Sequence, residues 1–174
     1  LPQEDMCQAT ATPPHLKYEV DGGPGTDTIM GLLNGSAQRE RDREVFFKAQ
    51  LLFWMLCAPD GHAKNFSLAL HAGGSYSLAP LYDVMSAYPL LGEGPGRLSR
   101  HKVKLAMAVR SQNPHWKMRD IQARHWAALA QSYGIGVAEG SGRAAVRTVA
   151  RDAAAALGMV QRQLPANFPT HVHE

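Results

Sequence analysis

The longest apolar stretch of the chain lies between Val45 and Cys57, directly after six consecutive charged residues at 39–44. Apolar residues recur there at the spacing of one helical face, at Val45, Ala49, Leu52, Phe53 and Leu56. Other apolar residues cover most of the remaining circumference, and a helix of this kind belongs in the centre of a domain. We therefore predict a central helix over about 39–57, which ends because Pro59 disfavours helical geometry at Ala58.

A β-hairpin is predicted directly after this helix. Apolar residues alternate with small or polar ones over 66–71, and a second run of this kind covers 76–81. The residues between the two runs are Ala72-Gly73-Gly74-Ser75, a composition typical of a tight turn.

The position of the turn predicts which residues face each other across the hairpin. With the turn centred between the two glycines, Asn65 pairs with Tyr82 and Lys64 pairs with Asp83. This pairing predicts that Asn65 and Asp83 lie at the same end of the hairpin, within reach of one metal ion.

The remaining pattern predicts an α+β domain that is mainly α-helical. Thr26 is expected to cap a short helix that ends at Leu33, and a strand is expected over 103–109. Two longer helices are expected over 118–133 and 143–164. The apolar face of the second is predicted at Val146, Val149, Ala153, Leu157, Val160 and Leu164.

Both ends of the chain have a different composition. Residues 1–25 are rich in Pro and Gly and are predicted to be irregular, and residues 165–174 are predicted to be a tail. The first residue is Leu1 rather than Met, so we expect the chain to be part of a longer protein.

Composition adds few constraints. The 174 residues suit one domain, and the net charge of +3 is compatible with a polyanionic partner but common among domains without one. Cys7 and Cys57 are far apart, and we expect buried free thiols, which are typical of a reducing cytosol. No uncharged apolar run reaches the roughly 18 residues of a membrane span, so we expect a cytoplasmic protein with no membrane partner.

Three polar residues around the hairpin have the layout of a kinase-type active site. Asp60 and Asn65 stand five residues apart in the loop after the central helix, and Asp83 follows the hairpin. In such phosphotransferases the first acid takes the proton of the acceptor hydroxyl, while the amide and the second acid hold magnesium. Mg²⁺ accepts a few hard oxygen ligands and retains water, so Asn65 and Asp83 are sufficient protein ligands. Lys64 is expected to neutralise charge on the transferred phosphoryl group.

Other interpretations stay open. Asp and Asn are frequent in turns and helix caps, and His62 has a structural hydrogen bond as its simpler role. A metal-dependent hydrolase that uses Asp60, His62 and Asp83 would bind metal without nucleotide. The basic run at 97–104 has no interleaved aromatic residues to stack on bases, so a solvated strand face is favoured over nucleic-acid binding.

The segment Asp60-Gly61-His62-Ala63-Lys64-Asn65-Phe66-Ser67 and the later Leu78-Ala79-Pro80-Leu81-Tyr82-Asp83 resemble the C-terminal lobe of the HipA family. Members of this family are bacterial serine/threonine protein kinases that act as toxins in HipBA-type toxin–antitoxin systems. The segments 1–8, 21–25 and 104–107 are also similar to that family, so the resemblance runs from residue 1 to about residue 110.

The resemblance implies a HipA-like kinase fold of two lobes, of which this chain is the C-terminal one. Within 1–174 it implies an N-terminal segment (1–25), a catalytic core (26–110), C-terminal helices (111–164) and the tail. The N-terminal lobe is absent from the chain.

Site residues follow from the resemblance by position. It implies that Asp60 is the catalytic base, that Asn65 and Asp83 are magnesium ligands, and that the nucleotide has further neighbours in His62, Lys64 and Tyr82. It also implies ATP as phosphoryl donor and a seryl or threonyl protein acceptor, since the targets of characterised members include aminoacyl-tRNA synthetases. A HipB-like DNA-binding antitoxin is the implied partner, with operator DNA contacted indirectly through it. The alternative is a non-catalytic module that binds antitoxin or DNA.

Two features set this chain apart from a complete kinase. It has no Gly-rich phosphate loop and no strand-borne lysine paired with a helix glutamate, both of which the N-terminal lobe should supply. We therefore expect the chain alone to bind ATP poorly and to transfer phosphate negligibly. Pro59 also stands where the family usually has a small polar residue, which removes one N–H from the catalytic loop.

Overall fold

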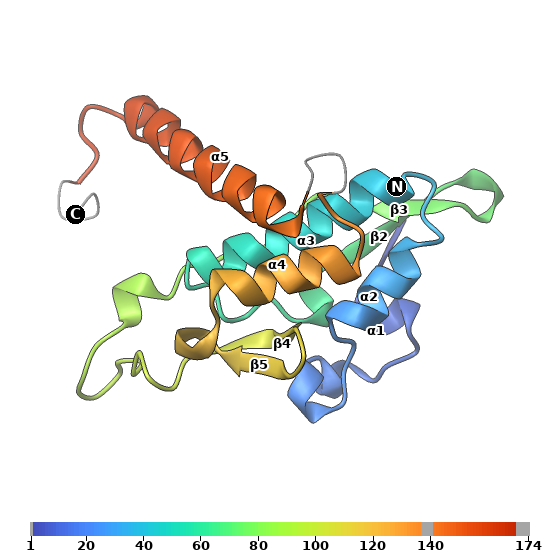
Figure 1. Cartoon of the computed structure of the whole chain (residues 1–174), viewed down its shortest axis with the longest axis horizontal. Coiled ribbons are helices and arrows are strands. Elements are labelled where there is room, and N and C mark those ends of the chain that lie inside the picture. Colours follow the sequence, from blue (N-terminus) through green and yellow to red (C-terminus); the bar gives the residue numbers. More distant parts are fainter. Residues whose placement is uncertain (1, 137–140, 170–174) are drawn as a thin grey trace.

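Helix α3 (Arg39–Met55) runs through the middle of the molecule, with the other helices and two small sheets around it (Figure 1). The structure is a computed structural model, and it describes residues 2–136 and 141–169. The fold is α+β with small antiparallel sheets, so the predicted class is confirmed.

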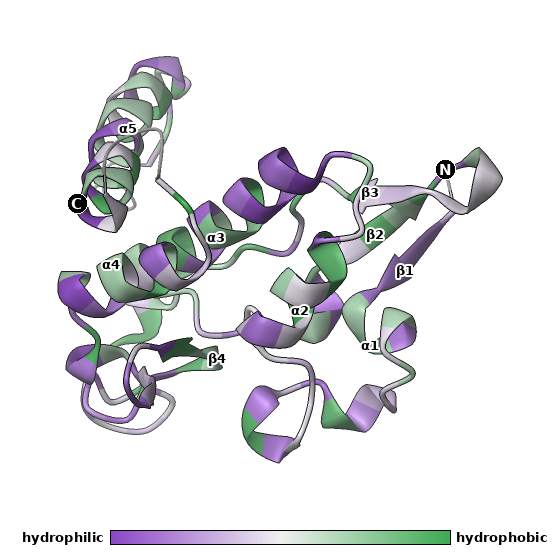
Figure 2. Cartoon of the chain, turned by 45° about the vertical axis from the view of Figure 1, so that its right-hand side comes forward, coloured by the Kyte–Doolittle hydropathy of each residue, from purple (hydrophilic) through white to green (hydrophobic). Residues whose placement is uncertain are grey.

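The buried face of α3 differs from the predicted one. Its buried residues are Asp42, Phe46, Phe47, Ala49, Gln50, Leu51 and Phe53. Leu56 was expected in the stripe but is 44% exposed, and Val45 and Leu52 are only half-buried. Because apolar residues lie all around this helix, their spacing alone could not select the face (Figure 2, where the charged first turns are purple).

The first sheet has three antiparallel strands in the order β1 (Gln3–Asp5), β2 (Ser67–Leu70) and β3 (Tyr76–Leu78). Strand β1 comes from the segment predicted to be irregular, and it leads into the short helix α1 (Met6–Ala9). Asp5 and Gln8 form a capping box at the start of α1, and this short element buries Met6 and Cys7 completely. A single buried pair is too short a pattern to reveal such an element in the sequence.

The predicted hairpin is confirmed, but its predicted register is wrong by one residue. Leu68 pairs with Leu78, and Leu70 pairs with Tyr76, so the turn is centred on Gly73 rather than between the two glycines. Gly73 has φ 79° and Gly74 has φ 77°, a left-handed geometry that glycine adopts without strain. The predicted pairings of Asn65 and Lys64 do not form, because β3 ends at Leu78.

The second sheet pairs β4 (Lys104–Arg110) with β5 (Pro114–Lys117). The predicted strand at 103–109 is confirmed, whereas β5 was missed and its neighbourhood was assigned to a helix. The helix predicted over 118–133 is α4 (Ala123–Ser132), and it begins later because residues 118–120 form a separate 3-10 turn.

Two other predicted helices are present. Helix α2 (Thr26–Leu33) matches its predicted range, although Gly25 rather than Thr26 occupies the cap position. The Thr26 hydroxyl instead donates a hydrogen bond of 3.0 Å to the carbonyl oxygen of Ala108 in β4. Helix α5 (Gly142–Gln163) matches the prediction for 143–164.

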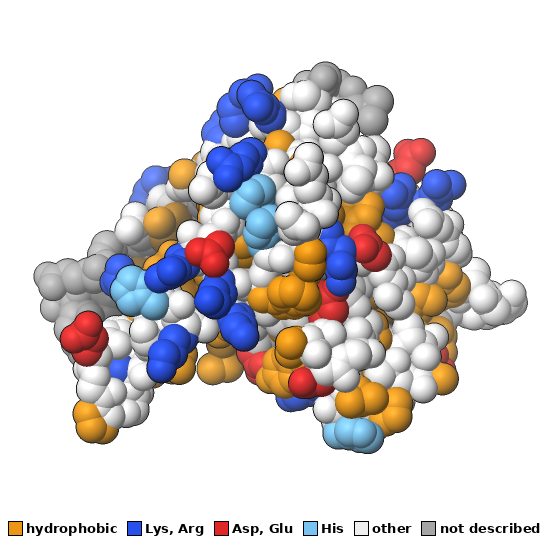
Figure 3. Space-filling view, turned by 60° about the horizontal axis from the view of Figure 1, so that its bottom comes forward, with side chains coloured by type: hydrophobic (Ala, Val, Ile, Leu, Met, Phe, Trp, Pro, Cys, Tyr) orange, Lys and Arg blue, Asp and Glu red, His pale blue; other side chains and the backbone are white. Residues whose placement is uncertain are grey.

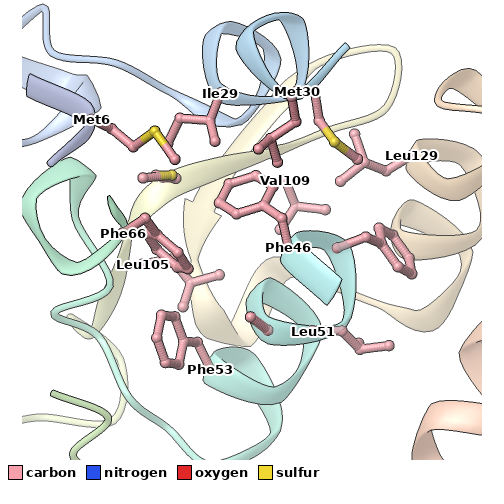
Figure 4. Close-up of a cluster of buried hydrophobic side chains, with 14 of the residues drawn as sticks. Met6, Ile29, Met30, Phe46, Leu51, Phe53, Phe66, Leu105, Val109 and Leu129 are labelled. Atoms are coloured by element: carbon pink, nitrogen blue, oxygen red, sulfur yellow. The ribbon is translucent and has the colours of Figure 1, made fainter. Parts of the chain in front are cut away.

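The core lies where α2, α3, β4 and α4 meet. Figure 4 shows Met30, Phe46, Val109 and Leu129 pointing toward one another from these four elements. Trp126 of α4 is 1% exposed and packs on α3, with its ring 6.1 Å from that of Phe47. A large core of this kind supports the end of α3, which leads into the loop that carries Asp60.

Helix α5 buries only its first half. Gly142, Ala145 and Val149 are buried, whereas Leu157, Met159 and Val160 are more than half exposed. The predicted apolar face is therefore only partly covered, and the second half projects from the body of the molecule (Figure 1). Cys7 and Cys57 are buried free thiols, as predicted. Within 2–136 and 141–169, no helix combines the length and apolar character needed to cross a membrane.

Candidate active site

The backbone turns sharply at the end of α3, and Asp60 lies at the surface just after this turn. Cys57 adopts φ 49°, and the N–H of Ala58 donates a hydrogen bond of 2.8 Å to the Phe53 carbonyl, which closes the helix. The N–H of His62 donates to the carbonyl of Asp60 at 2.9 Å. The Asp60 side chain is 60% exposed, so a large substrate can reach its carboxylate.

Gly61 packs so closely against α3 that there is no room for a side chain at this position. A Cβ atom at this position would lie 2.2 Å from the Phe53 ring, and Phe53 is buried. The loop beside Asp60 is thereby held against the core.

We expect Gly61→Ala to lower the free energy of unfolding by about 1–3 kcal/mol, because the added methyl group must displace a buried ring. Urea titration followed by circular dichroism measures the loss. The matched control is Gly31→Ala in α2, where an added Cβ meets no atom within 4 Å and alanine favours the helix. A Gly61→Ala variant as stable as Gly31→Ala would contradict the packing argument.

The structure brings Asn65 and Asp83 together. Asn65 lies in the 3-10 turn η3 (Ala63–Asn65), and its side-chain N–H donates a hydrogen bond of 2.7 Å to Asp83 Oδ2. Asn65 is 2% exposed, whereas Asp83 is exposed and adopts φ 57°. The predicted proximity of the two residues is therefore present, although the predicted strand pairing is not.

The pair has the donor set of a magnesium site. Asn65 Oδ1 is buried and has no hydrogen-bond partner, which is costly unless another group satisfies this oxygen. An amide oxygen and a carboxylate side by side are hard donors that suit Mg²⁺. Over the part of the chain that the structure describes, no three His, Cys, Asp or Glu side chains group as metal ligands.

Tyr18 orients the Asp60 carboxylate, and sequence reasoning missed it. Its hydroxyl donates a hydrogen bond of 2.6 Å to Asp60 Oδ1, and its ring meets the His62 ring edge-on at 5.2 Å. The hydrogen bond to Asp60, with burial, raises the pKa of Tyr18 to about 12, so the phenol remains a donor. Tyr18 belongs to the segment predicted to be irregular, and no local pattern indicates a contact with a residue 42 positions later.

Lys64 and Tyr82 make structural contacts beside the site. The Lys64 ammonium pairs with the carboxylate of Asp5 from β1, and its predicted contact with a phosphate stays a prediction. The Tyr82 hydroxyl donates a hydrogen bond of 2.7 Å to the Lys64 carbonyl and lies 2.7 Å from Ser67 Oγ. These contacts hold the segment that leads to Asp83 against η3.

His62 lies under the loop. It is 6% exposed, its Nε2 is 3.9 Å from Asp60 Oδ2, and its Nδ1 is buried without a partner. Burial lowers the pKa of His62 below its ordinary value of 6.5, although the nearby charge of Asp60 acts in the opposite direction. The imidazole is therefore held neutral near neutral pH.

We expect acid to destabilise the protein partly through His62. Because the pKa is lower in the folded state, the unfolded chain binds the proton more readily, and stability falls as pH drops below about 6.5. When the pH is lowered from about 7.5 to about 5.5, the free energy of unfolding should fall less in His62→Gln than in the wild type. Urea titration at each pH measures this difference. His15→Gln, at an exposed position, should retain the wild-type dependence. Equal pH dependence in all three proteins would show that His62 is not responsible.

Comparison with known proteins gives a consistent result. The family model described as HipA-like C-terminal domain matches residues 1–158. A Sinorhizobium fredii protein named "Putative kinase Y4mE" is 32% identical over 138 residues, which cover 78% of this chain and 30% of that protein. A solved Shewanella oneidensis complex of HipA, HipB and operator DNA contains a chain that matches with a TM-score of 0.75 and 19% identity. That match covers 98% of this chain and 39% of the other, so the chain spans less than half of either relative.

Proposed function

The chain belongs to the family of HipA-like C-terminal domains, and from this premise we propose that it is the C-terminal lobe of an ATP-dependent serine/threonine protein kinase. The observation that carries the proposal is the arrangement around η3. An exposed, oriented carboxylate at Asp60 stands in the same short loop as Asn65, and Asn65 contacts Asp83. This combination supports phosphoryl transfer more directly than a turn role for each residue.

In this proposal Asp60 accepts the proton of the substrate hydroxyl as the hydroxyl attacks the γ-phosphoryl group of ATP. Tyr18 occupies one carboxylate oxygen, which leaves Oδ2 to receive the proton. His62 is buried and neutral beneath the loop and supports its position rather than transferring protons. The Asp60 carboxylate must be ionised to act as a proton acceptor.

Asn65 and Asp83 are the residues that would hold magnesium. When bound there, the ion would neutralise charge on the nucleotide phosphates. Asn65 would offer Oδ1, which has no partner, and its N–H bond to Asp83 keeps the two side chains together. Lys64 and Tyr82 contribute by fixing the backbone that carries both ligands.

The activity proposed is that of the whole protein, because the relatives extend well beyond the matched segment. A Gly-rich phosphate loop and the lysine that grips the phosphates are expected on an N-terminal lobe. For the chain alone we expect weak ATP binding and negligible transfer.

We also propose that the whole protein is the toxin of a HipBA-type system. In the Shewanella oneidensis complex, HipA is found together with HipB and operator DNA, which supports a HipB-like antitoxin as partner and operator DNA as an indirect one. A protein such as an aminoacyl-tRNA synthetase is the substrate class that the family resemblance implies. The family assignment supports these partners.

A second candidate, a non-catalytic binding module, is favoured by one observation. Leu157 and Val160, which are three residues apart on the same side of α5, leave apolar surface uncovered there, which is typical of surfaces that bind other proteins. Such a module would not need an oriented carboxylate beside a pair of hard oxygen donors.

Labelled phosphoryl transfer from ATP in the presence of magnesium tests the kinase proposal, with the full-length protein that includes the upstream region. We expect label in the protein itself or in an added protein acceptor, and loss of label when EDTA removes magnesium. A folded full-length protein that binds Mg²⁺ and ATP but transfers no label would favour the binding module.

A further inference from the structure

A largely apolar cavity of about 450 Å³ lies beside the end of α3. Its apolar wall is formed by Trp54, Met55, Tyr88, Leu91, Val103 and Met118. Cys57, Arg100 and Arg119 complete the lining. A cavity of this size and character can enclose one large apolar side chain.

Hydrogen bonds join the walls of the cavity to the end of α3. The N–H of Ala87 donates to the Cys57 carbonyl at 2.7 Å, and the Tyr88 hydroxyl donates to the Met55 carbonyl at 3.1 Å. On the opposite side, Trp54 Nε1 donates to the Met118 carbonyl at 3.2 Å. The first two bonds hold the loop after Asp83 against the end of α3, and the third holds the segment after β5 against it.

The distance from the cavity to the base is short. Cys57 precedes Asp60 by three residues, so the backbone between them spans at most about 10 Å. A peptide anchored in the cavity would therefore place a residue a few positions away beside the Asp60 carboxylate.

The rim of the cavity is basic. Arg100 and Arg119 are exposed, and between Val84 and Val103 the chain has three Lys or Arg residues against one acid. Arg119 pairs with the exposed Asp120 at 3.3 Å and also lies 2.9 Å from His101 Nδ1, so the excess positive charge of the rim comes from the 97–102 stretch. Figure 3 shows Lys and Arg side chains gathered on the left-hand part of this face. The charge is complementary to acidic groups.

Exposed apolar side chains continue from the cavity. Met85 is 72% exposed, Tyr88 54% and Leu90 51%, all on the segment between Asp83 and the basic run. Several exposed apolar side chains along one segment suit an extended polypeptide better than a small molecule.

We propose that this cavity is the docking site for the protein substrate, and that it takes a large apolar side chain flanked by acidic residues. The proposal rests on the proposed kinase function, whose substrate class it specifies. In this proposal the large apolar side chain of the substrate lies in the cavity next to Cys57, and the acceptor hydroxyl lies beside Asp60.

Fluorescence anisotropy with the full-length protein tests the docking site without requiring catalysis. The probes are labelled peptides with a serine a few residues from a phenylalanine, flanked either by Glu or by Lys. We expect the Glu peptide to bind about tenfold more tightly than the Lys peptide. The charge-reversed variant with both Arg100→Glu and Arg119→Glu should lose or invert this preference. Arg151→Glu, an exposed arginine on α5, should keep it.

A photoreactive phenylalanine analogue at the anchor position locates the binding. Cross-links to Met55, Cys57 or Met118 are expected, and cross-links only elsewhere, or equal binding of both peptides by the wild type, would overturn the docking site. Acid-selective binding without phosphoryl transfer would leave the docking site standing while the kinase proposal fails. Phosphoryl transfer without preference for acidic peptides would support the kinase proposal and overturn the docking site.

Discussion

Asp60→Asn in the full-length protein is expected to lower the rate of phosphoryl transfer by roughly 10²–10⁴-fold, because an amide cannot accept the proton of the attacking hydroxyl. The substitution preserves size and can still accept the Tyr18 hydrogen bond, so the loop should keep its geometry. Transfer of label from ATP under single-turnover conditions measures the effect. Nucleotide binding should change little, because Asp60 is not one of the proposed magnesium ligands.

Asp152→Asn is the matched control for this substitution. Asp152 lies on α5, and its side chain is 59% exposed, close to the 60% of Asp60. It should leave the transfer rate unchanged. Full activity in Asp60→Asn would remove Asp60 from the role of base, and equal losses in both variants would indicate a general effect of charge.

The second large effect is expected for Asp83→Asn, on magnesium. Loss of the carboxylate charge should raise the magnesium concentration needed for nucleotide binding about tenfold or more, and lower transfer roughly 10²–10³-fold. Asparagine is well suited to the test, since it tolerates the left-handed backbone that Asp83 adopts at φ 57°. Magnesium titration with a fluorescent ATP analogue separates this binding defect from the loss of transfer.

Asp21→Asn, at an exposed position in the N-terminal segment, controls for the removal of one negative charge. Its magnesium requirement should equal that of the wild type. An Asp83→Asn protein with an unchanged magnesium requirement would exclude Asp83 as a ligand, whatever happens to the transfer rate.

Local sequence pattern predicted the parts of the site that depend on local structure. The long helix, the hairpin and the approach of Asn65 to Asp83 are all present in the structure. The predicted proximity of Asn65 and Asp83 is correct despite the register error of one residue, because strand pairing does not determine it. The backbone pairing ends with the hydrogen bond of 2.8 Å from the Ala79 N–H to the Ser67 carbonyl. Beyond it, the direct hydrogen bond between the Asn65 and Asp83 side chains brings these residues together.

Contacts between distant segments were not predictable in the same way. Tyr18 and Asp5 both come from a stretch whose composition indicates turns, yet one binds Asp60 and the other binds Lys64. Strand β5 was missed because it is short and begins with a proline, which weakens any strand pattern. Such elements are stabilised by the surface they meet rather than by their own residues, so the sequence around them carries little signal.

The hydrogen bond from Tyr18 has a consequence for how the lobe folds. Helix α3 and the β2–β3 hairpin form from neighbouring residues, whereas the bond to Asp60 closes a loop of 42 residues. Contacts between distant positions bear the larger entropic cost and tend to form late. Helix α3 and the hairpin can therefore form while the Asp60 carboxylate is still unoriented, and we expect the geometry around Asp60 to be acquired after these local elements.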